Sequence, residues 1–245
     1  MKSILKGLII ILLFANCSMQ NKVIFDVQKI FIDKLDEKKE KSNFFNKNEI
    51  FYEDADYIVT RTCSGEWGGS IWFKNKMNGI EYSCKAVCPV AVNLIHGKYF
   101  VTNSLAHLDQ YYSEIIEIRN PELMTVFKPS EPIEIKGGLE YRHTGDLETK
   151  SRKGIKVVWS ESGIMSICSF QYKGKLYNIM SKNGKTFLTT IKDNKLKILN
   201  QILEEQIWHS DTYKDEKGNL IIPFENDKIN GYIEIKGNLI KIIIK

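Results

Sequence analysis

The sequence has little net charge and few histidines, and both shortages narrow the functions it can have. It carries 35 Lys and Arg against 30 Asp and Glu, which gives a formal net charge of +5 at pH 7. A dedicated nucleic-acid-binding protein normally clusters Lys and Arg on one face, so this balance argues against that class. The 4 histidines are scattered and form no metal-ligand motif. We therefore expect no nucleic-acid partner, no metal site and no cofactor.

The chain also lacks an uncharged apolar run long enough to cross a bilayer. Its uncharged run Gly7–Asn16 is about half of the roughly twenty residues that a transmembrane helix needs. This run follows the short basic stretch Met1–Lys6, and that order is typical of an export signal. The sequence therefore predicts export without a permanent membrane span.

The end of this leader, Phe14-Ala15-Asn16-Cys17, resembles the lipobox of bacterial lipoproteins. In that family the cysteine becomes the lipidated first residue of the mature chain. The resemblance implies that residues 1–16 are a lipoprotein signal peptide and that Cys17 carries the lipid. It also implies a protein attached to a membrane of the cell envelope, on the periplasmic or surface side. An ordinary secretory signal with an incidental cysteine is the alternative.

Four further cysteines follow Cys17, an even number that permits three disulfide pairings in an exported chain. They are Cys63, Cys84, Cys88 and Cys168. If residues 57–63 and 80–87 are the first and third strands of a meander, they lie about 9.6 Å apart, beyond the reach of a disulfide. The Cys63–Cys84 pair is therefore disfavoured unless Cys63 lies past its strand end. One or two disulfides and buried free thiols all stay open.

From residue 57 onward, short apolar runs alternate with turn residues about every ten positions, which predicts antiparallel strands. The pattern is clearest over residues 155–199, where five β-type runs are separated by Gly or Asn. In residues 80–87, apolar and polar side chains alternate, so one face of that strand is expected to be buried. The run Leu239–Ile244 is too apolar for a free edge and is expected to pair inside a sheet.

These strands predict an all-β domain of antiparallel meanders over residues 57–245. Two groups of about four strands, near 57–118 and 155–199, suggest blades. The residues 98–105 and 113–121 loosely resemble the inner and middle strands of β-propeller blades. We therefore expect a small or partial β-propeller, with a β-sandwich or barrel as the alternative.

The segment before this domain, residues 17–56, is expected to form a tether and one short helix. The helix is predicted within Val23–Leu35, because apolar side chains recur there at helical intervals. Residues 120–154, rich in Pro and Gly, are expected to form a long loop or a boundary.

The most conspicuous candidate site is the segment Cys63–Trp72, in which three glycines surround Glu66 and Trp67. Glycines let a loop approach a ligand closely, and a tryptophan beside a carboxylate suits sugars or peptides. We therefore predict ligand binding by Glu66, Trp67 and Trp72. The alternative is that Trp67 fills the core and the glycines only turn the chain.

A second polar stretch, Asn103–Asp109, also follows a predicted strand. We expect Asn103 and His107 to lie near Glu66, and we predict no catalytic residue here. Ser104, His107 and Asp109 sit together along the chain, whereas triad members normally come from separate loops, and the nucleophile-elbow glycines are missing.

The sequence thus favours a non-catalytic binding or interaction module for an envelope protein or a glycan. Two alternatives stay open. A secreted glycan hydrolase of the propeller type needs two carboxylates facing each other across a cleft. A structural subunit of a surface assembly needs a broad apolar patch on one face.

Overall fold

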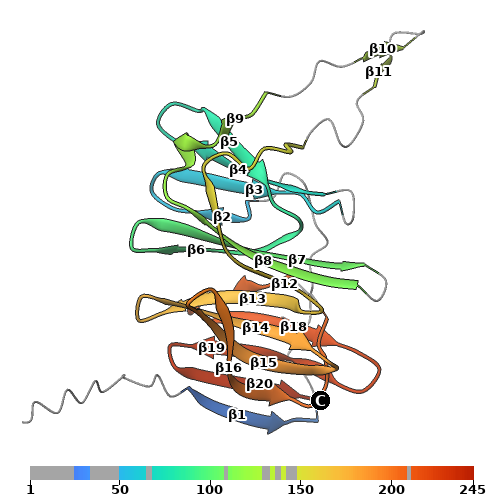
Figure 1. Cartoon of the computed structure of the whole chain (residues 1–245). Helices are drawn as coiled ribbons and strands as arrows, with labels where there is room; N and C mark the ends of the chain where they lie inside the picture. Colours follow the sequence, from blue (N-terminus) through green and yellow to red (C-terminus); the bar gives the residue numbers. More distant parts are fainter. Residues whose placement is uncertain are drawn as a thin grey trace, which may run out of the picture.

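The computed structural model describes residues 25–33, 50–64, 68–107, 110–128, 133–135, 139–141, 148–208 and 211–245. Four β-sheets stack face to face and follow one another mainly in chain order (Figure 1). A separate hairpin consists of β10 (Ile133–Ile135) and β11 (Leu139–Tyr141). The predicted all-β fold of antiparallel meanders is confirmed. Within the described residues the sheets form an open, propeller-like series and do not close into a barrel.

Sheets I and II form the upper half of the stack (Figure 1). Sheet I pairs in the order β2-β3-β4-β5-β9, with β2 (Tyr52–Glu53), β3 (Tyr57–Arg61), β4 (Ser70–Asn75), β5 (Glu81–Lys85) and β9 (Thr125–Val126). Sheet II pairs in the order β12-β8-β7-β6, with β6 (Pro89–Ile95), β7 (Lys98–His107), β8 (Gln110–Ile118) and β12 (Ile155–Ser162). The sequence groups residues 155–160 with the later meander, but β12 pairs antiparallel with β8. A short 3-10 helix, η2 (Pro121–Leu123), precedes β9.

Sheets III and IV form the lower half. Sheet III is the meander β13 (Met165–Tyr172), β14 (Lys175–Lys182), β15 (Lys185–Lys192) and β16 (Lys195–Leu203). Sheet IV pairs in the order β1-β20-β19-β18-β17, with β1 (Asp26–Phe31), β17 (Tyr213–Lys214), β18 (Leu220–Glu225), β19 (Asn230–Lys236) and β20 (Leu239–Ile244). The predicted pairing of the last strand inside a sheet is confirmed, because β20 lies between β19 and β1.

The hairpin turns of sheet III show why the turn residues were good predictors. Between β14 and β15, Asn183 and Gly184 have φ values of 51° and 76°. Between β15 and β16, Asp193 and Asn194 have φ values of 53° and 57°. Two successive positive φ values match the twist of two-residue hairpins, and Asn, Asp and Gly adopt them most readily.

The helix predicted within residues 23–35 is wrong for the described part of that segment. Residues 26–31 form β1, which pairs parallel with β20 from Asp26 opposite Leu239 to Phe31 opposite Ile244. A short apolar run fits helical and strand spacing alike, and the open edge of β20 supplies hydrogen-bond partners for a strand. Tertiary pairing therefore decides the conformation.

Each half of the stack has its own apolar core. Between sheets I and II, the fully buried side chains include Val59, Phe73 and Ile116. Between sheets III and IV, a larger cluster includes Ile179, Ile233 and Ile240. The sheets within each half are therefore joined mainly by apolar packing.

The interface between sheets II and III is different, because many of its buried groups are polar. The Thr102 and Ser169 hydroxyls lie 2.7 Å apart, and Asn93 Nδ2 donates to Ser169 Oγ at 2.8 Å. Ser166 N donates to Ser113 Oγ, which itself donates to the Ile164 carbonyl. The two halves therefore meet through a polar layer, beside the small apolar cluster of Ile115, Trp159, Ile164 and Met180.

Candidate functional site

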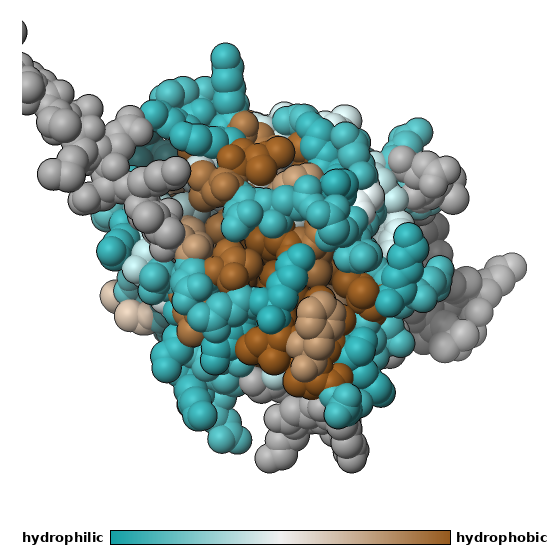
Figure 2. Space-filling view, turned by 90° about the horizontal axis from the view of Figure 1, so that it is seen from below, coloured by the Kyte–Doolittle hydropathy of each residue, from teal (hydrophilic) through white to brown (hydrophobic). Residues whose placement is uncertain are grey.

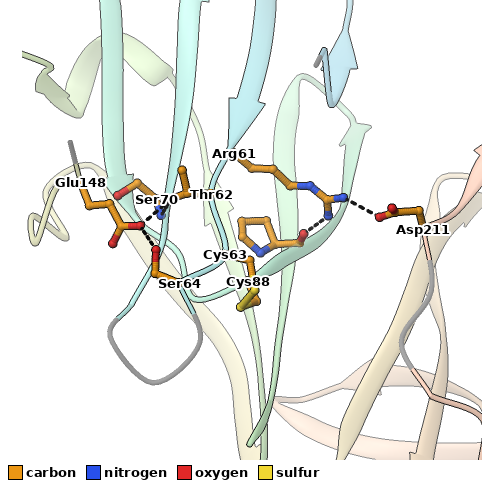
Figure 3. The surroundings of a disulfide bond; sticks show 9 residues. Arg61, Thr62, Cys63, Ser64, Ser70, Cys88, Glu148 and Asp211 are labelled. Atoms are coloured by element: carbon orange, nitrogen blue, oxygen red, sulfur yellow. Dashed lines mark hydrogen bonds and ion pairs between the residues drawn. A yellow bond between two sulfur atoms is a disulfide. The ribbon is translucent and has the colours of Figure 1, made fainter. Parts of the chain in front are cut away.

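The loop between β3 and β4 is held firmly at its base by a disulfide. Cys63, just after β3, is bonded to Cys88, just before β6, with their Cα atoms 4.1 Å apart (Figure 3). The sequence leaves this pairing open together with others. Cys84 and Cys168 are buried free thiols, and burial raises the pKa of each to about 12, so both stay protonated at neutral pH.

Hydrogen bonds reinforce the same loop base. Glu148, from the segment that returns to β12, accepts hydrogen bonds from Thr62 Oγ1 at 2.8 Å and from Ser64 Oγ (Figure 3). Ser64 N donates to the Gly68 carbonyl at 3.1 Å. Gly69 allows a close approach of three segments, because an added Cβ would lie 2.6 Å from the Ala86 carbonyl oxygen. The residues on both sides of positions 65–67 are thus held together by hydrogen bonds.

Arg61, at the end of β3, ties this base to two other segments. Its guanidinium donates to the Pro89 carbonyl and forms a 3.1 Å ion pair with Asp211, which precedes β17 (Figure 3). The guanidinium carbon also lies 3.8 Å from the centre of the Phe51 ring, a cation–π arrangement. Asp211 therefore joins sheet I to the segment that leads into β17 of sheet IV.

The end of β7 lies beside the disulfide. Ser104 N donates to the Cys88 carbonyl at 3.0 Å. Because Cys88 is bonded to Cys63, the residues that follow β3 lie close to the last part of β7. Next to Ser104, Asn103 is 1% exposed and its Nδ2 lies 3.5 Å from a carboxylate oxygen of Glu114. The Oδ1 atom of Asn103 is buried without a hydrogen-bond partner.

Glu114 of β8 is a buried carboxylate that pairs with a partly exposed arginine. It is 4% exposed, and Arg152 binds both of its oxygens, at 2.7 and 3.3 Å. The Tyr112 hydroxyl lies 3.3 Å from the same carboxylate. The hydrogen bond with Glu114 raises the pKa of Arg152, while burial next to this carboxylate raises the pKa of Tyr112. The Arg152 guanidinium therefore balances the charge of the buried Glu114 carboxylate.

The five residues predicted to bind a ligand fall into three groups. Glu66 and Trp67 lie outside the described residues. Trp72 is 5% exposed on the outer face of sheet I, where its ring meets Phe127 edge-on at 5.7 Å, and its indole N–H has no hydrogen-bond partner. Asn103 is buried as described above, and His107 is exposed at the end of β7. The Cys63–Cys88 disulfide and the Ser104–Cys88 hydrogen bond thus bring the residues that flank positions 65–67 close to Asn103.

Sequence reasoning missed the charged residues that organise this end. Glu148 lies 86 residues from Thr62, and Arg152 lies 38 residues from Glu114. Both come from the Gly- and Pro-rich connection over residues 120–154, which was predicted only as a loop or boundary. No local spacing links such residues, and co-variation among relatives would be the signal able to pair them.

The described residues contain no group of three or more His, Cys, Asp or Glu side chains placed to hold a metal ion. In this part of the chain, no helix has the length and hydropathy needed to cross a bilayer.

Comparisons with known proteins identify no family for this chain. No protein-family model and no curated protein matches the chain. Among solved structures, the chain is similar to Drosophila Semaphorin 2a with a TM-score of 0.32 and 8% identity. The matched region covers 71% of this chain and 41% of the semaphorin chain, so the chain spans about two fifths of that protein. A similarity this weak supports no inference about function.

Proposed function

We propose that the chain is a lipid-anchored protein of the cell envelope whose mature part is a non-catalytic binding module for an envelope protein or a glycan. The apolar leader that ends at Cys17 supports the anchor. The Cys63–Cys88 disulfide supports an oxidising compartment, because disulfides persist mainly outside the cytosol.

The observation that carries the binding role is the fixed base of the 65–67 loop. The disulfide, the Glu148 hydrogen bonds and the Ser64–Gly68 closure all act on the residues that flank this loop. A loop on a rigid base loses less conformational entropy when it binds. Glu66 and Trp67 supply a carboxylate and an indole for contacts with a sugar or peptide.

The other predicted residues take different parts in this proposal. Trp72 and Asn103 are buried, so we assign them to the support of the binding surface. His107 is exposed at the end of β7, and we assign it a direct contact with the ligand.

The test is capture of ligands by the mature lipidated chain from a glycan panel and an envelope-protein extract. We expect Trp67→Ala to weaken the captured interaction at least about tenfold, as loss of an aromatic anchor does. The control is Met77→Ala, a 94% exposed apolar residue in the turn at the far end of β4, which should bind like the wild type. Unchanged capture by Trp67→Ala would contradict the site, and release of products from a glycan would favour the hydrolase instead.

A further inference from the structure

The lower end of the stack carries apolar side chains on its outer face and edge. Figure 2 looks onto this end and shows apolar residues gathered at the centre and ringed by hydrophilic ones. On the outer face of sheet IV, Ile221, Tyr232 and Ile243 form a buried cluster, with Ile32 packed against it. On the edge strand β1, Ile30 lies on the same face as this cluster and Phe31 on the opposite face, and their side chains are 37% and 75% exposed.

The exposure of Phe31 does not come from a frayed strand end. Phe31 is in register with Ile244 of β20, and the next residue, Ile32, donates its N–H to the Ile244 carbonyl at 2.9 Å. The backbone on both sides of the exposed ring is therefore paired. A large aromatic side chain held in water on an ordered strand suggests a surface that covers it.

The sequence places the predicted lipid close to this strand. Phe25 is buried, and its ring packs edge-on against Phe170 and Tyr177 at 5.9 and 4.8 Å. Phe25 therefore fixes the point at which the chain enters the fold. The eight residue steps from Cys17 to Phe25 can reach at most about 29 Å when fully extended.

This reach keeps β1 close to the bilayer surface, because β1 begins directly after Phe25. Figure 1 shows β1 at the lower end of the molecule and the strands of sheet I at the upper end. A lipid on Cys17 therefore holds the lower end, and not sheet I, next to the bilayer.

We propose that the sheet IV end, with Ile30 and Phe31, rests on the lipid bilayer and that sheet I points away from it. This inference rests on the proposed lipid anchor at Cys17. The exposed Lys29 between Gln28 and Ile30 suits this position, because lysine next to apolar side chains is favoured at membrane surfaces. The inference places the Cys63–Cys88 disulfide and the residues that flank positions 65–67 in the half of the molecule farther from the membrane.

The test uses a nitroxide spin label at Phe31→Cys in the lipidated mature chain, reconstituted into phosphatidylcholine–phosphatidylglycerol vesicles. Met77→Cys is the matched control, because Met77 is also apolar and is 94% exposed in the turn between β4 and β5 of sheet I. Native Cys84 and Cys168 are buried, so they should not react with the label. Circular dichroism checks that both variants keep their strand content.

We expect the label at position 31 to collide with oxygen dissolved in the bilayer and to be shielded from a water-soluble nickel chelate, with the reverse at position 77. Equal access of nickel to both positions would overturn the orientation. A label at position 31 that is shielded from both reagents would also overturn it, in favour of a protein or a second copy as the covering surface. Mass spectrometry of Cys17 on the same sample separates the two proposals, because an unacylated chain overturns the anchor and the orientation together.

Discussion

The stack contains two kinds of sheet interface, and their difference shows how the molecule is divided. Sheets I and II, and sheets III and IV, are joined by apolar cores, whereas sheets II and III meet through hydroxyl and amide groups. Full burial of one isoleucine contributes about 1.5–3 kcal/mol, and one hydrogen bond contributes about 0.5–1.5 kcal/mol net. Each half is therefore expected to behave as a cooperative unit, with the middle interface weakest.

Unpaired polar atoms weaken the middle interface further. The side chains of Ser104, Ser166 and Asn178 have buried polar atoms without a hydrogen-bond partner. An unsatisfied buried polar group costs about 1–3 kcal/mol. The apolar cores of the two halves must offset this loss.

The strongest test of the comparison replaces two adjacent isoleucines of β8 that point to opposite sides. Ile116 lies in the apolar core against sheet I and Ile115 in the middle interface, and both are 0% exposed. We expect Ile116→Ala to lower the free energy of unfolding by about 4 kcal/mol and Ile115→Ala by about 2–3 kcal/mol. The smaller value is expected because the flexible Met180 beside Ile115 can fill part of the cavity.

Urea denaturation of both variants measures the two losses. Met77→Ala, at a 94% exposed position, is the control and should leave the free energy of unfolding almost unchanged. Equal losses from the two isoleucines would show that the middle interface packs as tightly as the apolar cores.

A second test separates paired from unpaired hydroxyls within the middle interface. Ser169 Oγ bonds with Thr102 and Asn93, whereas Ser166 Oγ has no partner. We expect Ser169→Ala to destabilise the protein by about 1–2 kcal/mol, because it leaves buried partners unsatisfied. Ser166→Ala should be neutral or stabilise by up to about 1 kcal/mol. Thermal unfolding measures both, and destabilisation by Ser166→Ala would instead indicate a bound water at that hydroxyl.

The smallest expected effect is a pH dependence from Glu117, on the same face of β8 as Ile115. The hydrogen bond from Arg119, at 2.8 Å, and Lys98 nearby hold the Glu117 pKa below its usual range. A depressed carboxyl pKa contributes stability above the unfolded value of about 4.3, and that stability is lost as the pH falls through the folded value. The urea midpoint of wild type should therefore exceed that of Glu117→Gln at about pH 6, and the gap should close by about pH 3. A gap that stays constant with pH would contradict this assignment.

The sequence predicts most of the strands because their signals are local. Turns such as Asn183–Gly184 and Asp193–Asn194 need residues that tolerate positive φ, and those residues mark the hairpins of sheet III. The helix expected within residues 23–35 fails because β1 is determined by β20, more than two hundred positions later in the chain. The grouping of residues 155–160 with the later meander fails for the same reason, since β12 pairs with β8, which precedes the long 120–154 connection.

For the candidate site too, some residues can be predicted from the nearby sequence, whereas others depend on contacts between distant parts of the chain. The glycines around Glu66 and Trp67 mark a loop, and the structure shows how the residues on both sides of it are fixed. The contributions of Arg152 and Glu148 depend on distant contacts. The burial of Trp72 was equally hidden, because an alternating strand pattern does not reveal that the later residue Phe127 covers this ring on the outer face of sheet I.

The pairing of β1 with β20 also sets an order of events during synthesis. Because Asp26–Phe31 needs Leu239–Ile244 as its neighbour, the first strand waits for almost the whole chain before it can dock. Contacts of such long sequence separation slow folding, since a large loop must close first. Sheets I and II use residues 52–162 and can assemble earlier, so the half proposed to lie nearer the membrane is completed last.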